Sequence, residues 1–334
     1  IGGACVKPII VGVDVGGTAI KMALLDTEGN ILAKTQEPTP VADGEDSVLQ
    51  KVVDMATSML HQHGFSKEQV AGIGVGIPGP VDAANGIVYQ AVNLHWKRPV
   101  PLRDKLQALT GLPVAVDNDA NTAALGEMWR GSGQGAKDMV LITLGTGVGG
   151  GVILHGKVVN GIHGVGGEIG HITMVPEGGP ACNCGKTGCL ETYASATAII
   201  REGLKAAQEG TSPLLAETLA RQGDIKAKDV LDAAKAGDAA ALAITDQVAF
   251  YLGLALSHLA ATLNPAKFII GGGVAAAGEF LFSRVRESFR RFVPFSHVAE
   301  STEILPATLG NDAGVIGAGW LIRDSLVISD SVVK

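Results

Sequence analysis

One histidine and three cysteines lie close together in the second half of this 334-residue sequence, and all four are residue types that bind metal ions. They are His171, Cys182, Cys184 and Cys189. Three thiolates and one imidazole complete the tetrahedral shell of a structural zinc ion and leave no coordination position for a substrate. The alternative is a set of surface thiols without a metal; the short Cys-x-Cys spacing and an intracellular setting argue against a disulfide. We predict a structural Zn²⁺ that anchors the loop carrying Glu168 and Glu191.

Two glycine-rich bends, each between two apolar runs, have the composition of phosphate-binding loops. The first follows residues 9–13 and contains Asp14, Gly16, Gly17 and Thr18; the second occupies residues 145–151. Glycine has no Cβ, so several backbone N–H groups can point at one anion. Asp14 adds a carboxylate that can hold Mg²⁺, directly or through water. Tight hairpins without a ligand are the alternative, but the repeated bend and a third glycine cluster at 271–273 favour nucleotide binding.

The run Asp117-Asn118-Asp119-Ala120-Asn121 ends a short apolar segment and begins an amphipathic one. Asn118 or Asp119 at such a junction can simply cap the helix. The functional alternative is that Asp119 faces a cleft between domains and accepts the proton of an alcohol.

Three other motif matches do not fit the structures they usually indicate. Residues 74–79 and 145–150 both read G-x-G-x-x-G, but prolines follow the first and an apolar strand follows the second, so neither opens the helix of a dinucleotide site. Residues 180–187 are similar to a P-loop, yet proline replaces the first glycine and no strand precedes them. We therefore predict no Rossmann site and no P-loop.

Strand-like and helix-like segments alternate along the chain, which predicts an α/β protein. Each glycine bend is expected to join two strands of a hairpin, so we predict two structurally similar halves. Expected helices cover 119–130, 192–207, 227–236, 239–263, 278–291 and 312–325, with a further one around 48–60; expected strands include 70–75, 113–116 and 267–270. The polar stretch 208–228 has no clear assignment.

Length and composition favour a soluble globular protein of about two domains. Asp and Glu outnumber Lys and Arg by 33 to 26, for a net charge of −7, which argues against binding to nucleic acid or an anionic membrane. Residues 247–266 approach the length of a membrane span, but their polar residues and proline favour a buried helix. The N-terminal residues do not have the layout of a signal peptide, and Cys5 stands alone, so we expect a cytoplasmic protein.

Taken together and in order, these motifs resemble the ROK family of repressors, open-reading-frame proteins and sugar kinases. The resemblance rests on Asp14-x-Gly-Gly-Thr-x-x-Lys21, Asn118-Asp119-x-Asn121, the segment 144–151, Glu168-Ile-Gly-His171 and the three cysteines. It implies an actin-like ATPase (ribonuclease H-like) fold with two α/β domains around a cleft. The expected small domain comprises residues 1–118 plus 308–334, and the large domain, with the zinc loop, comprises 119–307.

The resemblance also implies a role for each motif residue. Asp119 would be the general base. The sugar hydroxyls would be bound by Asn93, Asn118, Asp119, Glu168, His171 and Glu191, with His171 also ligating zinc. ATP and Mg²⁺ would be held by Asp14, Gly16, Gly17, Thr18, Lys21, Gly145, Thr146, Gly147, Gly149 and Gly150, and the adenosine would be flanked by Gly271, Gly272 and Gly273.

The resemblance leads us to expect an ATP-dependent kinase that phosphorylates glucose at its 6-hydroxyl. Kinases for fructose, mannose or N-acetylmannosamine share the same motifs and remain alternatives, as do a non-catalytic sugar sensor and an actin-like structural ATPase. Repressors of the family carry a helix-turn-helix before the first phosphate bend. Only thirteen residues precede Asp14 here and the chain is acidic, so we expect no DNA binding. The resemblance further implies a homodimer or homotetramer.

Overall fold

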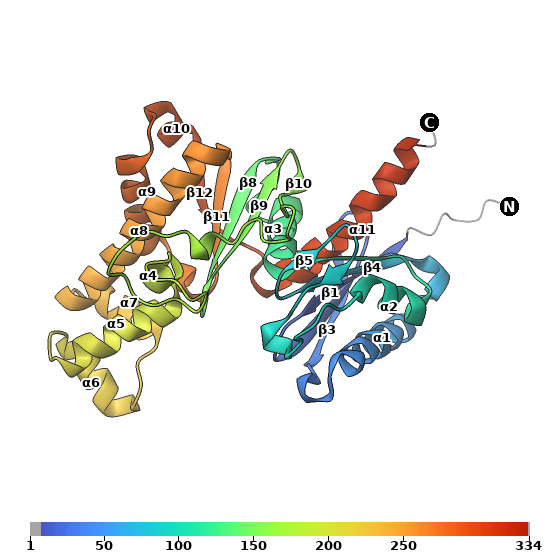
Figure 1. The fold of residues 1–334 in the computed structure, drawn as a ribbon, viewed down its shortest axis with the longest axis horizontal. Coiled ribbons are helices and arrows are strands. Elements are labelled where there is room, and N and C mark those ends of the chain that lie inside the picture. Colours follow the sequence, from blue (N-terminus) through green and yellow to red (C-terminus); the bar gives the residue numbers. More distant parts are fainter. Residues whose placement is uncertain (1–7, 333–334) are drawn as a thin grey trace.

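The computed structural model describes residues 8–332, and it has two halves, each built on a five-stranded sheet (Figure 1). Cys5 lies outside the described residues. The first sheet has the order β3-β2-β1-β4-β7. Its strands are β1 (Ile9–Val15), β2 (Ala19–Leu25), β3 (Ile31–Pro38), β4 (Val70–Ile77) and β7 (Val114–Asn118). Strands β1 to β3 pair antiparallel, whereas β4 lies parallel to both β1 and β7.

The second sheet repeats this arrangement with the order β10-β9-β8-β11-β12. Its strands are β8 (Met139–Leu144), β9 (Val148–Leu154), β10 (Lys157–Val158), β11 (Lys267–Gly271) and β12 (Glu303–Pro306). Again three strands pair antiparallel, and β11 lies parallel to β8 and β12. The prediction of two similar halves, each opening with a hairpin, is confirmed. A small ribbon, β5 (Val81–Asp82) with β6 (Ile87–Val88), extends the first half.

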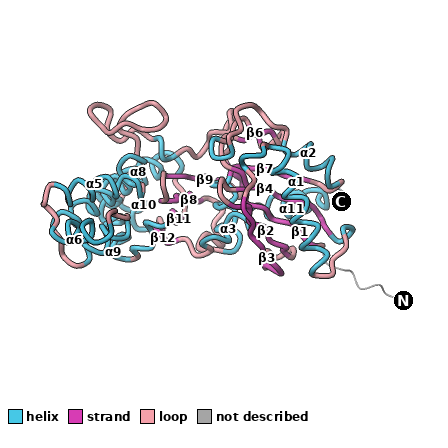
Figure 2. The backbone as a smooth tube through the Cα atoms, turned by 90° about the horizontal axis from the view of Figure 1, so that it is seen from below, coloured by secondary structure: helices cyan, strands magenta, loops and turns pink. Residues whose placement is uncertain are grey.

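Helices cover both faces of the first sheet because its strands are apolar on both sides. On one face α1 (Glu45–Gln62) and α2 (Leu102–Thr110) pack on side chains such as Val11 and Val13. On the other face α11 (Ala313–Val332) covers Ile10 and Leu25. The helix α3 (Asp119–Arg130) packs against both sheets and against α11, so it lies at the junction of the halves (Figures 1 and 2).

Glycines allow the backbone of α11 to contact the backbones of α3 and the first sheet directly. A Cβ placed on Gly317 would lie 1.6 Å from the carbonyl oxygen of Thr122 in α3, and one on Gly126 would lie 2.1 Å from that of Ala313. The same holds on the sheet, where a Cβ on Gly74 would lie 1.7 Å from the Ala318 carbonyl oxygen. Such contacts exclude any side chain, because real Cβ atoms do not come this close to a carbonyl oxygen.

The second half is rich in helices, which gather on one side of its sheet (Figure 1). They are α4 (Glu191–Ala194), α5 (Ala196–Gln208), α6 (Pro213–Gln222), α7 (Ala227–Lys235), α8 (Ala239–Leu263), α9 (Glu279–Phe292) and α10 (Ser296–Ser301). Single 3-10 turns occur at Val41–Asp43, Lys67–Gln69, Val92–Leu94, Ile169–His171, Gly273–Ala277 and Gly310–Asp312.

Two of the sequence expectations for this half need correction. The single helix expected over 192–207 is broken at Ser195, whose hydroxyl caps α5 by accepting from the N–H of Ala198 at 3.1 Å. The unassigned polar stretch contains α6, which begins at Pro213 after the capping residue Ser212.

Helix α8 has the length and composition of a membrane span. It packs against α4, α5, α7 and α9 inside the second half. Its buried side chains include Val248, Leu252, Leu256 and Leu259. The structure therefore agrees with the interpretation of this stretch as a buried helix.

Candidate functional site

A cavity of about 500 Å³ lies where the two halves meet. Its wall includes Gly271, Gly272 and Gly273 after β11, together with Ala313 at the start of α11 and Ala123 in α3. Gly272 has φ +87°, and a Cβ there would lie 2.4 Å from the Leu144 carbonyl oxygen, so the backbone needs glycine at this point. The third glycine cluster therefore borders a cavity at the end of β11. The same cavity lies beside the end of β8, the strand that leads into the second bend.

Hydrogen bonds within its own hairpin, and one from Thr39 directly after β3, hold the first glycine bend. Its Gly16 N–H donates to the Ala19 carbonyl at 2.9 Å, and the Thr39 hydroxyl donates to the Gly16 carbonyl at 2.7 Å. The N–H groups of Gly17 and Thr18 have no hydrogen-bond acceptor in the part of the chain that the structure describes. Asn93 lies beside this bend, because a Cβ on Gly17 would come within 2.9 Å of its carbonyl oxygen.

Glu191 and α5 hold the second bend through hydrogen bonds with its backbone. The Glu191 carboxylate accepts from the Val148 N–H at 2.9 Å, and the Thr197 hydroxyl donates to the Thr146 carbonyl at 2.7 Å. A Cβ on Gly147 would lie 2.1 Å from Glu191 Oε2. The structure thus places the Glu191 carboxylate in direct contact with the second bend.

Asp119 begins α3, and the residue before it caps the helix. Asn118 Oδ1 accepts from the N–H of Ala120 at 2.8 Å and of Asn121 at 3.3 Å, while its Nδ2 donates to the Gly79 carbonyl at 3.0 Å. The expected helix 119–130 agrees with these bounds. A Cβ on Gly151 in β9 would lie 2.8 Å from the Ala120 carbonyl oxygen, so the first turn of α3 touches the hairpin that contains the second bend.

Asp119 is close enough to Asp14 for its charge to affect the pKa of Asp14. Burial raises the pKa of Asp119 above its usual range. Burial also raises the pKa of Asp14, the cation of Lys21 at 3.6 Å opposes this rise, and the negative charge of Asp119 adds to it. Two carboxylates that share one desolvated region attract cations. Asp14, Lys21, Asp119 and the first bend therefore form one polar group at the junction.

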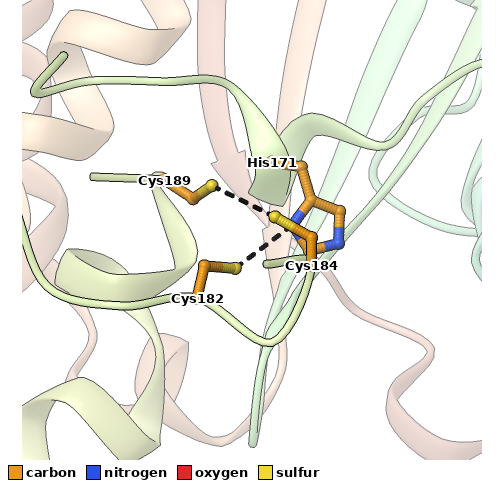
Figure 3. Close-up of side chains that lie close together, drawn as sticks. All are labelled: His171, Cys182, Cys184 and Cys189. Atoms are coloured by element: carbon orange, nitrogen blue, oxygen red, sulfur yellow. Dashed lines mark hydrogen bonds between the residues drawn. The ribbon is translucent and has the colours of Figure 1, made fainter. Parts of the chain in front are cut away.

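The histidine and the three cysteines converge as the zinc prediction requires (Figure 3). Their ligand atoms lie within 4.8 Å of one another; His171 Nδ1 is 3.5 Å from Cys182 Sγ, and Cys184 Sγ is 3.7 Å from Cys189 Sγ. Ligand atoms around a tetrahedral zinc are ~3.8 Å apart for Zn–S bonds of about 2.3 Å. Burial raises the pKa of Cys189 to about 12, whereas hydrogen bonding lowers that of Cys184. The donor set and its spacing fit zinc.

His171 connects this cluster to the predicted sugar ligands. Its Nδ1 faces the cysteines, while its Nε2 lies 3.8 Å from Glu168 Oε2. Glu191 Oε1 accepts from the Cys182 thiol at 3.9 Å. The cluster, Glu168, Glu191 and the second bend thus form a second group. Within the described residues, Asp119 has no hydrogen bond or ion pair with Glu168, Glu191 or Asn93.

Sequence reasoning missed two polar side chains near these groups, one buried and one half-buried. Glu127 in α3 is fully buried, and its carboxylate accepts from the N–H groups of Ser132, Thr308 and Leu309 at 2.8–3.0 Å, which fixes the segment before α11. Asn160, after β10, contacts Asp117 across the two halves. The position of Glu127 on the buried side of an amphipathic helix could have predicted that its side chain is buried. No feature of the sequence indicates the contact of Asn160.

Three comparisons extend these observations. The profile of the ROK family matches residues 10–325. A glucokinase of Halalkalibacterium halodurans is 52% identical over 313 residues, covering 94% of both chains, and a glucokinase of Thermotoga maritima is 39% identical over 95% of this chain and 98% of its own. The crystal structure of a ROK family glucokinase from Streptomyces griseus, in complex with glucose and AMPPNP, is similar with a TM-score of 0.76, 37% identity and coverage of 95% of this chain and 99% of that one.

Proposed function

The chain belongs to the ROK family, and from this premise we propose that Asp119 and the two glycine bends transfer the γ-phosphoryl group of ATP to glucose. The fold is the actin-like ATPase fold with two domains. The reaction is the ATP-dependent phosphorylation of glucose, for which the site residues described above supply a mechanism. The observation that carries the role of Asp119 is its position: a desolvated carboxylate at the start of α3, coupled to Asp14 and next to the second hairpin.

Transfer requires an acceptor hydroxyl in line with the γ-phosphorus and a group that takes the hydroxyl proton. The 6-oxygen of glucose forms the new bond to phosphorus as the bond to the leaving oxygen of ADP breaks. The proton of the 6-hydroxyl moves to a carboxylate oxygen of Asp119. A raised pKa suits this role, because it makes the ionised carboxylate a stronger base.

The phosphate groups need donors and positive charge. The N–H groups of Gly17 and Thr18 in the first bend have no hydrogen-bond acceptor among the described residues, so they could donate to phosphate oxygens. Gly145, Thr146, Gly147, Gly149 and Gly150 form the second bend. Lys21 adds a cation beside Asp14. Mg²⁺, which neutralises phosphate charge in such reactions, would be held by Asp14. The adenosine would occupy the cavity bordered by Gly271, Gly272 and Gly273.

The hydroxyl groups of glucose would be bound by Asp119 and by polar side chains of both halves. These are Asn93 beside the first bend, Asn118 in the cap of α3, and Glu168, His171 and Glu191 around the second bend. A zinc ion on His171 Nδ1 and the three cysteines would keep Nε2 oriented towards Glu168. The zinc is structural in this proposal and takes no part in transfer.

We also propose the assignment of domains and the setting of the enzyme. Residues 1–118 and 308–334 would form the small domain, and 119–307 the large one, because α11 packs on the first sheet. The acidic charge and the sugar substrate support a soluble cytoplasmic enzyme without nucleic-acid or membrane partners. Membership of the ROK family supports a homodimer or homotetramer.

The test is an assay of ADP release by the purified protein with glucose, fructose, mannose and N-acetylmannosamine, with Asp119→Asn as the background control. We expect the highest kcat/KM with glucose. A higher kcat/KM with another hexose would transfer the assignment to that sugar. Sugar binding without ADP release from any of the four would instead support the sugar sensor.

A further inference from the structure

Asp117 is a buried carboxylate that the transfer reaction does not use. It is the second-last residue of β7 in the first half and is only 3% exposed. Its carboxylate accepts four hydrogen bonds. The Asn118 N–H and Asn121 Nδ2 donate to Oδ1 at 2.7 Å and 2.8 Å. Asn160 Nδ2 donates to both oxygens, at 2.9 Å from Oδ1 and 3.1 Å from Oδ2. A carboxylate with these donors is already satisfied by the protein, so it is a poor acceptor for a substrate proton.

Asn160 comes from the second half, where it begins the loop that leads to Glu168. The Gly166 N–H donates back to the Asn160 carbonyl at 2.7 Å, which closes the loop on itself. Gly164, at its tip, lies against the first half, since a Cβ there would be 2.3 Å from the Val81 carbonyl oxygen. The Glu168 N–H donates to the Val165 carbonyl at 3.4 Å at the end of the same loop. The loop is thus fixed at its start by Asp117 and ends at a predicted sugar ligand.

We propose that Asp117 and Asn160 form a clasp between the two halves that positions the loop 160–168, and through it Glu168, for binding of the sugar. Asp117 holds the Asn118 N–H and the Asn121 side chain with the same carboxylate. One group therefore orients the start of α3, where Asp119 lies, and the loop that ends at Glu168. Asp117 is a positioning residue in this proposal, not the base.

This inference rests on the proposed function, since it assigns Glu168 to the sugar. Loss of the clasp frees the start of the loop, whereas Gly167 near its end still packs on the second bend, since a Cβ on Gly150 would lie 2.6 Å from the Gly167 carbonyl oxygen. We therefore expect the KM for glucose to rise while the KM for ATP stays the same. A role in folding alone would change the melting temperature without this difference between the two substrates.

Asn160→Ala is the primary variant, because Asn160 is only half-buried and its removal leaves the sheet intact. We expect its KM for glucose to rise about tenfold or more, the effect of losing a hydrogen bond to a charged group, with the KM for ATP within about twofold of the wild type. Asn30→Ala is the matched control: it also removes an Asn-to-Asp hydrogen bond, of 2.8 Å, but in a surface turn away from the loop. We expect its KM values to be those of the wild type.

The exchange variant Asp117→Asn with Asn160→Asp tests the pairing itself. The new amide at 117 can still accept from the Asn118 N–H and Asn121, and its own NH₂ donates to the new carboxylate at 160. We expect this double variant to recover the KM for glucose to within about threefold of the wild type. An unchanged KM for glucose in Asn160→Ala, or failure of a folded exchange variant to recover it, would overturn the clasp.

Hydrogen exchange separates this proposal from the proposed function. The backbone amides of residues 160–168 are expected to exchange faster in Asn160→Ala and at the wild-type rate in the exchange variant, whether or not the protein phosphorylates glucose. Wild-type exchange rates in Asn160→Ala would contradict the clasp. A wild-type protein that is inactive on glucose would contradict the proposed function alone.

Discussion

Among the single side chains, Asp119 has the role that is simplest to test. Asp119→Asn keeps the shape of the side chain and leaves the cap at Asn118 in place, so the melting temperature should change little. We expect kcat to fall by roughly 10²–10⁴, the usual contribution of a positioned proton acceptor, and sugar affinity to change much less. Turnover, glucose affinity and melting temperature should be measured on one preparation; near-normal turnover would rule out Asp119 as the base.

The pH dependence of activity follows from the same carboxylate. Asp119 accepts a proton only when it is ionised, and burial raises its pKa above the ordinary value of 3.8. Activity should therefore fall as the pH is lowered through this raised pKa, so the acidic limb of kcat/KM should lie above pH 3.8. The residual activity of Asp119→Asn should lack this limb. A limb that persists unchanged in the variant would assign it to another group.

Glu168 should affect the sugar and not the nucleotide. Glu168→Gln replaces one of two accepting oxygens by an NH₂ group, which costs on the order of 1–3 kcal/mol, or roughly 5–150-fold in Kd, if the carboxylate binds hydroxyl groups. Calorimetry with glucose and with an ATP analogue measures both affinities. Equal losses for the two ligands would indicate that Glu168 supports the fold.

The zinc loop is an element whose order depends on four ligands. Cys184→Ala should lower the zinc content from about one ion per chain and weaken glucose binding together, because Glu168 and Glu191 both contact ligands of the cluster. Metal analysis and glucose titration of the same samples make this comparison. Wild-type protein purified without any zinc would contradict the site, and loss of zinc with unchanged glucose affinity would contradict its link to the sugar.

The crossing of α3 and α11 should tolerate no side chain. Gly317→Ala places a Cβ 1.6 Å from the Thr122 carbonyl oxygen, so we expect a loss of stability of at least about 1–3 kcal/mol despite the better helix propensity of alanine. Gly319→Ala on the same helix is the matched control, because its one contact that is too short, 2.2 Å, is with Cδ1 at the end of the flexible Leu25 side chain and not with backbone. Thermal unfolding should rank Gly317→Ala well below Gly319→Ala.

Elements with strong local signals were predicted from the sequence, and elements fixed by tertiary contacts were not. Helix α3 was predicted because Asn118 caps an amphipathic segment that follows a strand. The break between α4 and α5 was missed, since it depends partly on the Ala196 N–H, which donates to the Gly145 carbonyl in the second bend at 2.8 Å. Strand β3 was also missed, because its residues are half-buried or exposed and two of them are charged.

At the scale of the whole molecule, the motifs predicted the identity of the site residues better than the contacts between them. The zinc ligands were found by spacing alone, and the structure brings them together. The two bends and Gly271 to Gly273 gather around one junction because both sheets share a topology and α3 packs against each. The Asp117–Asn160 pair joins residues from the two sheets, and no local pattern in either segment indicates such a contact.

The position of α11 has a consequence for how the protein is made. Ribosomes synthesise β1 about 300 residues before α11, yet Val315, Ile316 and Ile322 of α11 complete the apolar layer over Ile10 and Leu25. In a nascent chain, α1 and α2 can therefore cover one face of the first sheet early, whereas the other apolar face stays uncovered until α11 has left the exit tunnel. Contacts of such long sequence separation form slowly, and exposed apolar surface aggregates or binds chaperones in the meantime. The N-terminal half, although first to emerge, should be the last to become resistant to protease during translation.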